Sequence, residues 1–300
     1  MKEHALFHLE LCRQLEEKNI VVKLNTDGSK LNNLCIGGVV SSLILARDLS
    51  ELVFIQIILK DKFFVLGRGS NTFFYGDRIN VPVVKLGSSF NKVVKISTNK
   101  FFVGAGVHID SFARKVSLDG YSGLEFAVGI PGSFGGAIKM NAGAHSHEMS
   151  DIVDRVIFLK EGRIYSERPD FGYRSCGIPE ASVIVGGEIR LVESCPQKTL
   201  QVVRNNLEYR RDTQPVNVPS LGSVFKNPPN HTAAQLIESV KLKGFKIGGC
   251  LFSSTHANWI VNPEKKGTYQ DVESLVKLAK EQVRAKRGVI LELEWVILKG

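Results

Sequence analysis

The sequence is poor in cysteine, in proline and in long apolar runs, and each shortage excludes a class of protein. Its 300 residues include five cysteines and ten prolines. The cysteines are scattered singly without a C-x-x-C pair, which argues against a zinc site or a disulfide framework and suits a reducing cytoplasm. The longest apolar run, Val53–Leu59, is interrupted by Gln56 and is much shorter than the ~20 residues that span a bilayer. Charged residues near the N-terminus predict that no secretory signal is present.

The composition is that of a folded, basic protein. Hydrophobic residues make up 43% and charged residues 23% of the chain, which excludes a mainly disordered protein and suits about two domains. Residues 196–300 carry 16 Lys and Arg against nine Asp and Glu, so most of the net charge of +9 lies there. Such a region attracts nucleic acid, acidic lipid or a phosphorylated small molecule, although a solvated basic surface is the simpler explanation. Without a basic run or an aromatic RNA-binding cluster, nucleic acid is not expected.

Hydrophobic periodicity predicts a mixture of strands and short helices, which indicates an α+β fold. A glycine-rich connection is expected over 129–144, and a domain boundary near Ser194–Gln197. Helices are predicted over 5–18, 48–57, 110–118, 198–211, 233–243 and 269–287. Strands are predicted over 20–24, 63–66, 81–86, 93–97, 101–104, 153–160, 163–165, 182–191, 256–261 and 289–298.

Two glycine segments are candidates for ligand contact. Gly67–Asn71 follows a predicted strand but matches neither the dinucleotide fingerprint nor the Walker pattern, so a tight turn is the simpler explanation. Val128–Ala144 is far more specific, because glycine and alanine recur through it in several clusters. A segment with so little side-chain bulk brings its backbone close to something. Its consecutive N–H groups predict the binding of a pyrophosphate.

The second glycine segment resembles the flavin-binding core of the UDP-N-acetylenolpyruvoylglucosamine reductase family. Further blocks resemble that family in the same order, over about residues 20–298. They are Gly37–Gly38, Leu66–Asn71, Gly104–Gly106, Gly123–Phe126, Phe171–Ser175, Gly222–Pro228, His256–Asn262 and Leu291–Glu294. The segment 210–220 resembles the family's type II form, which lacks an additional substrate-covering loop.

The resemblance implies a PCMH-type FAD-binding domain over 1–195, made of two α+β subdomains split near residue 90, and a substrate-binding domain over 196–300. It also implies NADPH as reductant, UDP-N-acetylglucosamine enolpyruvate as substrate, a role in peptidoglycan precursor synthesis, and a cytoplasmic monomer without a metal. The implied FAD-binding residues are Gly67, Arg68, Gly69, Ser70, Asn71, Gly106, Ile130, Pro131, Gly132, Ser133, Gly135, Gly136, Ala137, Asn141, Ala142 and Gly143.

The implied reaction adds a hydride to the vinyl carbon C3 and leaves negative charge at C2, which requires an acid and charge stabilisation. By resemblance, Ser223 protonates C2, Arg174 holds the substrate carboxylate, and Glu294 polarises the enolpyruvyl group. Glu292 lies on the same face of the predicted strand as Glu294, so periodicity does not choose between them, whereas the family's spacing chooses Glu294. The implied substrate-binding residues are Arg211, Lys226, Asn227 and His256.

Three other functions compete with the reductase. They are a flavin oxidase of the same fold acting on a neutral alcohol, an inactive flavin- or nucleotide-binding regulator, and a basic nucleic-acid-binding protein. The chain departs from the family's usual residues at 33–35 and 145–146, which affects the flavin contacts expected near Cys35 and His145. Covalent attachment of flavin at these two residues is not expected, because the reductase blocks are otherwise intact. The joint presence of Arg174, Ser223 and Glu294 favours the reductase.

Overall fold

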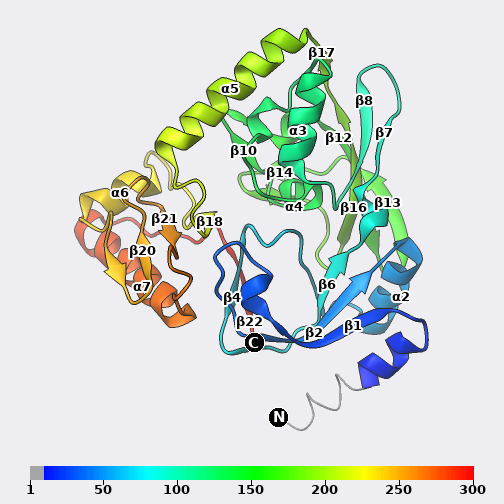
Figure 1. The fold of residues 1–300 in the computed structure, drawn as a ribbon, viewed down its shortest axis with the longest axis horizontal. Coiled ribbons are helices and arrows are strands. Elements are labelled where there is room, and N and C mark those ends of the chain that lie inside the picture. The colour runs from blue at the N-terminus through cyan, green and yellow to red at the C-terminus, as the bar shows by residue number, and fades with distance from the viewer. Residues whose placement is uncertain (1–9) are drawn as a thin grey trace. The chain divides into compact units, whose positions relative to one another are not determined.

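The structure is a computed structural model that describes residues 10–300. Residues 10–16 are helical as predicted, and residues 5–9 of that predicted helix lie outside the described residues. Helices and strands are interspersed along the chain (Figure 1), which confirms the α+β class. The chain divides into two compact units, each built from three segments. Unit 1 comprises the residues up to 24, 42–68 and 81–209, and unit 2 comprises 25–41, 69–80 and 210–300.

A five-stranded sheet carries the strand that leads into the Gly67–Asn71 loop. Its order is β1-β2-β6-β3, with β5 also paired to β2, and β2, β3 and β6 run parallel. Helix α2 (Leu49–Leu59) packs on it by burying Leu52 and Ile55 against Ile44 and Val84. The strands are β1 (Val21–Asp27), β2 (Val39–Ala46), β3 (Phe64–Val65), β5 (Arg78–Ile79) and β6 (Val83–Leu86).

The start of α2 has an N-cap but no reciprocal capping box. The Asp48 carboxylate accepts a hydrogen bond from the Glu51 backbone N–H at 3.0 Å. The Glu51 carboxylate, however, accepts from the backbone N–H of Arg47 at 2.7 Å and also pairs with the Arg47 guanidinium. The helix therefore has Asp48 as its N-cap. The Glu51 side chain bonds the backbone of Arg47, one residue before the N-cap, rather than that of Asp48 itself.

The central sheet of unit 1 is antiparallel, and its inner strands β12 and β16 are covered on both faces. Its order is β13-β12-β16-β8-β7. Helices α3 (Ile109–Leu118) and α4 (Phe134–Lys139) pack on one face, and alternate residues of β12 and β16 turn toward the cluster around α2 on the other. Because both faces are covered, β16 is almost continuously apolar. The strands are β7 (Val93–Lys95), β8 (Lys100–Gly104), β12 (Val153–Lys160), β13 (Arg163–Glu167) and β16 (Val183–Arg190).

The predicted glycine-rich connection contains a helix, α4, which is a correction to the sequence analysis. The Ser133 hydroxyl caps it by accepting from the Gly136 backbone N–H at 3.3 Å. Phe134 and Ile138 are fully buried in the unit 1 core. Two glycines disfavour a helix by about 1 kcal/mol each, but the burial of these two large side chains offsets that cost.

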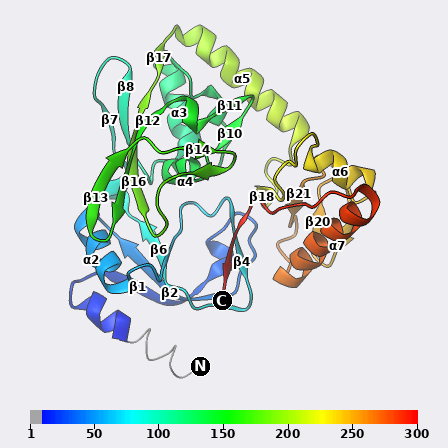
Figure 2. The same ribbon diagram turned by 180° about the vertical axis from the view of Figure 1, so that it is seen from behind.

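Unit 2 contains a four-stranded antiparallel sheet, β18-β21-β20-β19. Helices α6 (Ala233–Ser239) and α7 (Tyr269–Arg287) belong to the same core as this sheet. Figures 1 and 2 show both helices beside the sheet. Helix α7 has the predicted bounds, with a capping box of Thr268 and Asp271 and a left-handed Gly288 at its end. The strands are β18 (Ser220–Ser223), β19 (Lys246–Ile247), β20 (Cys250–Phe252) and β21 (Trp259–Val261).

The end of the chain is less regular than the predicted strand over 289–298. Only β22 (Val296–Lys299) is a strand, and it pairs in parallel with β4 (Thr72–Tyr75). Before it, a single bridge joins Leu293 to Phe225. This segment runs along two different partners in turn, so it forms no continuous ladder.

The compact units do not follow the predicted linear division. The predicted boundary at 196 coincides with the start of α5 (Pro196–Thr213), whereas the units divide near its end. Two earlier segments join unit 2, because Leu34, Ile36 and Phe73 are buried in its core and β4 pairs with β22. The flavin-binding and substrate-binding assignments of the predicted domains stay predictions.

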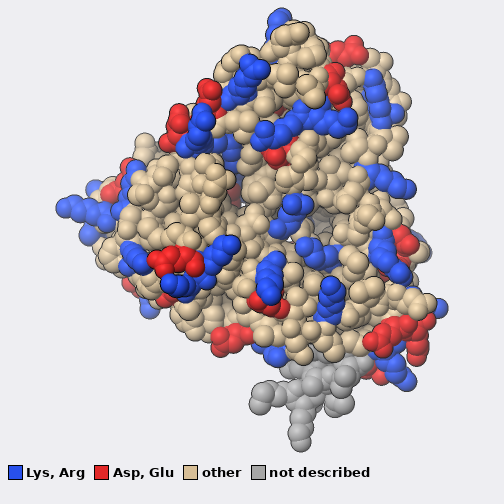
Figure 3. Space-filling model, in the orientation of Figure 1, with Lys and Arg blue, Asp and Glu red and all other residues tan. Residues whose placement is uncertain are grey.

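Several short elements connect these sheets. The short strands are β9 (Tyr121–Ser122), β10 (Gly143–Ala144), β11 (His147–Glu148), β14 (Phe171–Gly172), β15 (Ser175–Cys176) and β17 (Val192–Glu193). In the face drawn in Figure 3, Lys and Arg side chains are widely distributed, with Asp and Glu among them. No helix within residues 10–300 is long and apolar enough to cross a membrane.

Candidate active site

The Gly67–Asn71 loop is held by close backbone approaches at two glycines. Leu66 donates its N–H to the Val84 carbonyl at 2.9 Å, so the loop leaves the sheet beside β6. A Cβ on Gly67 would lie 2.6 Å from the Ser133 Oγ, and one on Gly69, whose φ is +67°, would lie 2.1 Å from a backbone oxygen. Neither position accepts a side chain without local rearrangement. The loop therefore packs closely against neighbouring residues at both glycines, whereas its sequence alone suggested a simple tight turn.

Most of the backbone N–H groups in the second glycine segment already have protein partners. Gly129 donates to the Asp110 carboxylate at 2.5 Å, and Gly135 donates to the Ala105 carbonyl at 2.9 Å. Within the described chain, the N–H groups of Gly132 and Ser133 make no such bond. Ser133 lies beside Gly67, because a Cβ built on Gly67 would lie 2.6 Å from the Ser133 Oγ. A bare backbone cradle of this kind fits the phosphates of a dinucleotide.

Asn141, predicted to bind FAD, has a second role in the structure. Its side chain is fully buried, and its φ is +39°. The Nδ2 donates to the Gly172 carbonyl at 3.1 Å, and the Oδ1 accepts from the Ser150 backbone N–H at 3.0 Å. Asn141 therefore ties the glycine segment to the hairpin of β14 and β15.

Arg174 lies in the two-residue turn of that hairpin. Gly172 and Ser175 pair across the turn, and Arg174 adopts a left-handed φ of +55°. Its guanidinium lies 5.2 Å from the centroid of the Tyr173 ring. The hydrogen bond from the Asn141 side chain to the Gly172 carbonyl holds the backbone two residues before Arg174. Arg174 belongs to unit 1.

The backbone segments that carry Ser223 and Glu294 meet within unit 2. Ser223 ends β18 and pairs with Trp259. The Glu294 backbone N–H donates to the carbonyl of Val224 at 2.9 Å, and the Asn71 side chain donates to the Glu294 carbonyl at 3.2 Å. The structure thus brings together one predicted flavin-binding residue and two predicted catalytic residues that are far apart in the sequence.

Asn258 is a functional candidate that the sequence analysis did not single out. Only 3% of it is exposed, and its backbone carbonyl accepts from Val224 N–H at 2.8 Å. Its side chain accepts from Phe225 N–H at 3.0 Å and donates to the Phe225 carbonyl at 2.8 Å. These bonds fix the backbone directly after Ser223. The only sequence signal was its place in the His256–Asn262 block.

Two predicted substrate-binding residues, Lys226 and Asn227, follow this anchored segment. The Lys226 Nζ lies 3.7 Å from the Glu292 carboxylate, and its backbone N–H donates to the Glu292 carbonyl at 2.9 Å. The Asn227 Oδ1 accepts from the Ala233 N–H at 3.0 Å and so supports the start of α6. Their contact with substrate stays a prediction.

The other two predicted substrate-binding residues differ in exposure. Arg211 is largely exposed on α5, with its Nε 3.9 Å from the Asp212 carboxylate. His256 is half-buried, and burial lowers the pKa of its imidazole. Its Nδ1 accepts from the Asn258 N–H at 3.3 Å. Burial therefore favours the neutral imidazole, and His256 supports Asn258 through this bond.

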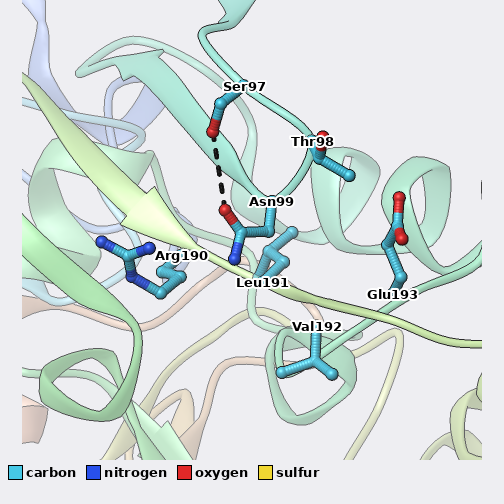
Figure 4. A pocket seen from close by; sticks show the side chains of 7 residues that line it. All are labelled: Ser97, Thr98, Asn99, Arg190, Leu191, Val192 and Glu193. Atoms are coloured by element: carbon cyan, nitrogen blue, oxygen red, sulfur yellow. Dashed lines mark hydrogen bonds between the residues drawn. The ribbon is translucent and has the colours of Figure 1, made fainter.

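A shallow pocket of about 410 Å³ lies elsewhere in unit 1. Ser97 and Asn99 are among the residues that line it, with the Ser97 hydroxyl 3.5 Å from the Asn99 Oδ1 (Figure 4). None of the predicted site residues lines this pocket. No group of three or more His, Cys, Asp or Glu within the described residues is arranged to hold a metal ion.

Comparison with known proteins identifies the class of this fold and then its family. The FAD binding domain profile matches residues 46–164, and the profile of the UDP-N-acetylenolpyruvoylglucosamine reductase C-terminal domain matches residues 214–298. Together they define an FAD-dependent oxidoreductase. The Bacillus subtilis UDP-N-acetylenolpyruvoylglucosamine reductase is 33% identical over 302 residues, covering 97% of this chain and 99% of the relative. This chain belongs to the UDP-N-acetylenolpyruvoylglucosamine reductase family.

Two further comparisons agree with this assignment. The Anoxybacillus flavithermus reductase is 37% identical over 235 residues, covering 76% of this chain and 77% of the relative. The crystal structure of the Thermus caldophilus UDP-N-acetylenolpyruvylglucosamine reductase superposes with a TM-score of 0.81 at 29% identity, over 93% of this chain and 98% of the other. The family and its FAD are therefore as the resemblance implied, whereas the predicted contact residues stay predictions.

Proposed function

We propose that this protein reduces UDP-N-acetylglucosamine enolpyruvate to UDP-N-acetylmuramate in peptidoglycan precursor synthesis, with NADPH as reductant. The family assignment supports this activity, because the named relatives match almost the whole chain. When bound, reduced FAD supplies the hydride that adds to the vinyl carbon C3. The glycine cradle at Gly67 and Ser133 fits that cofactor.

We assign delivery of a proton to C2 to the hydroxyl of Ser223. Hydride addition makes C2 strongly basic, so a serine hydroxyl is a sufficient acid toward it. The observation that carries this assignment is the 2.9 Å hydrogen bond from Glu294 N–H to the Val224 carbonyl, next to Ser223. It supports the assignment, because it holds the backbones next to Ser223 and at Glu294 together in one unit.

Arg174 and Glu294 are assigned to the charge that develops on the enolpyruvyl group. A guanidinium can hold the substrate carboxylate with two parallel hydrogen bonds and balance the added charge. Glu294 polarises the same group. The substrate's diphosphate suits the basic C-terminal region, and Arg211, Lys226, Asn227 and His256 are its proposed binding residues.

Stopped-flow kinetics of the two half-reactions tests the role of Ser223. In Ser223→Ala, flavin reduction by NADPH should stay within twofold of the parent, and reoxidation by the enolpyruvyl substrate should slow by about 10²–10⁴-fold. Ser220→Ala, on the same strand, is the matched control and should leave both rates unchanged. Equal loss in both half-reactions of Ser223→Ala would exclude the proton-donor role.

We further propose that the enzyme is a cytoplasmic monomer that does not act on nucleic acid. Its five cysteines are free thiols, which suits a reducing compartment. Light scattering with size-exclusion chromatography tests the oligomeric state, and a mass of two chains would contradict the proposal.

A further inference from the structure

Asn262, the residue directly after β21, is a fully buried amide to which the sequence analysis assigned no role of its own. Its Nδ2 donates to the carbonyl of Leu34 at 3.0 Å, although the two residues are 228 positions apart in the sequence. Its Oδ1 accepts from the backbone N–H of Gly267 at 2.9 Å. Ile36 and Cys250 also lie against Gly267, so the amide is enclosed in a largely apolar core.

The loop that Asn262 holds is itself ordered by a second buried amide, Asn32. Only 6% of Asn32 is exposed. Its Nδ2 donates to the carbonyls of Ile36 at 2.7 Å and Gly28 at 3.1 Å, and its Oδ1 accepts from the Leu34 N–H at 3.1 Å. Leu34 is therefore bonded at its N–H by Asn32 and at its carbonyl by Asn262.

The loop over residues 28–36 in turn supports the Gly69–Asn71 part of the first glycine segment. Asn33 donates its N–H to the Gly69 carbonyl at 2.9 Å. A Cβ on Gly69 would lie 2.1 Å from the Leu31 carbonyl oxygen, so the two loops approach each other too closely for a side chain between them. A shift of the first loop would therefore also move the second.

Asn71 connects these loops to Glu294. Its side chain donates to the Glu294 carbonyl at 3.2 Å, and its own carbonyl accepts from the Val296 N–H at 2.9 Å. Both bonds lie where the pairing of β4 with β22 begins, and the two strands lie side by side in Figures 1 and 2. A continuous series of contacts therefore leads from Asn262 to Glu294, and all of its residues belong to unit 2.

Asn262 also holds the strand that carries the other predicted catalytic residue of this unit. Its backbone N–H donates to the carbonyl of Pro219 at 3.0 Å, and Pro219 directly precedes β18, the strand that ends at Ser223. An amide buried in an apolar core costs free energy unless it is bonded. When it is bonded on both sides, it fixes the relative positions of the backbone groups that it joins.

We propose that Asn262 is a positioning residue, which sets the position of Glu294 relative to Ser223 by holding the 28–36 loop against Gly69. The inference rests on the proposed function, because it takes Glu294 as the group that polarises the substrate. A displacement of about 1 Å at a reacting group can slow a reaction by about 10²-fold. Loss of the bond to Leu34 should therefore be measurable in the kinetics.

A double-mutant cycle followed by stopped-flow kinetics at saturating FAD tests this role. Asn262→Asp keeps the size of the side chain and the acceptor for Gly267, but a carboxylate cannot donate to the Leu34 carbonyl. Flavin reoxidation by the enolpyruvyl substrate should slow at least tenfold, and reduction by NADPH should stay within twofold of the parent. In the Glu294→Gln background the same substitution should slow reoxidation by less than twofold, because no carboxylate remains to be positioned. Gln270→Glu, an amide-to-carboxylate change at an exposed position of α7, is the matched control and should change neither rate.

The other outcomes overturn the proposal. An unchanged reoxidation rate in Asn262→Asp excludes the role, and equal slowing in both backgrounds shows an effect that does not act through Glu294. A normal rate in Glu294→Gln alone overturns the catalytic assignment of Glu294 and this proposal with it, whereas a slow Glu294→Gln beside a normal Asn262→Asp overturns this proposal only. If Asn262→Asp does not fold, the neutral Asn262→Ser, whose hydroxyl is one bond nearer the backbone, decides in the same two backgrounds.

Discussion

Glu292 and Glu294 are two residues apart, yet the structure gives them different surroundings. The Glu292 side chain is 74% exposed and pairs only loosely with Lys226 at 3.7 Å, whereas Glu294 is half-buried and its backbone is bonded on both sides. An exposed ion pair of this kind contributes about 0–1 kcal/mol. Alternation in the sequence left the two glutamates equivalent, whereas their surroundings in the structure differ. Glu294 stays the predicted catalytic residue.

The two glutamates therefore provide a matched pair of variants. Glu294→Gln should slow flavin reoxidation by the enolpyruvyl substrate by about 10²-fold, because it removes the carboxyl group proposed to polarise the substrate. Glu292→Gln should change that rate by less than twofold. Stopped-flow absorbance of the flavin measures both. A slow Glu292 variant beside a normal Glu294 variant would reverse the assignment.

Arg174 offers a second test at the scale of one residue. Arg174→Lys keeps the charge but removes the planar fork, so reoxidation should slow by at least tenfold while reduction by NADPH persists. Arg168→Lys, at an exposed position just before the hairpin, is the control for loss of a guanidinium in this region. A rate near that of the parent would show that charge alone suffices.

At the scale of elements, one buried amide connects the glycine segment to the Arg174 hairpin. Asn141→Ala removes bonds to Gly172 and Ser150. The free energy of unfolding should fall by about 2 kcal/mol because buried backbone groups lose partners, and reoxidation should slow because the turn loosens. Urea unfolding and stopped-flow kinetics measure the two effects. The exposed Asn205→Ala should show neither effect, and a stable but slow Asn141 variant would point to direct ligand contact instead.

The helices also show which parts of the fold could be predicted from the sequence. Helix α7 was predicted with correct bounds, because its apolar stripe, the basic residues of its last turn and Gly288 are all local signals. Helix α4 was missed, because its formation depends on burying Phe134 and Ile138 in a core assembled from distant strands. The role of Asn258 was hidden for the same reason, since its partner Phe225 lies 33 residues away. The family blocks singled out Ser223 and Glu294 as candidates, but no local pattern predicted the backbone bond from Glu294 to Val224.

At the scale of the whole molecule, a half-buried histidine makes stability depend on pH. Burial lowers the pKa of His256 below its ordinary value of 6.5, despite an opposing effect of Glu238. The unfolded chain therefore binds the proton more readily, so stability is full above pH 6.5 and is lost as pH falls through the folded pKa.

Urea unfolding between pH 7.5 and 5 measures this dependence. His256→Asn keeps an acceptor for the Asn258 N–H and should flatten the loss of stability over that range. The exposed His231→Gln should retain the slope of the parent. An unchanged slope in His256→Asn would assign the pH dependence to other groups.

The pairing of β4 with β22 joins residues near 72 to residues near 299. On the ribosome, β4 therefore leaves the exit tunnel long before its partner has been synthesised. During that interval Phe73 lacks part of the core that later buries it, and the Asn71 side chain lacks the Glu294 carbonyl to which it later donates. A polypeptide that stops before residue 294 would contain both glycine segments but would lack the Glu294 carboxylate. Assembly of the predicted catalytic residues in unit 2 is thus tied to synthesis of the chain through β22.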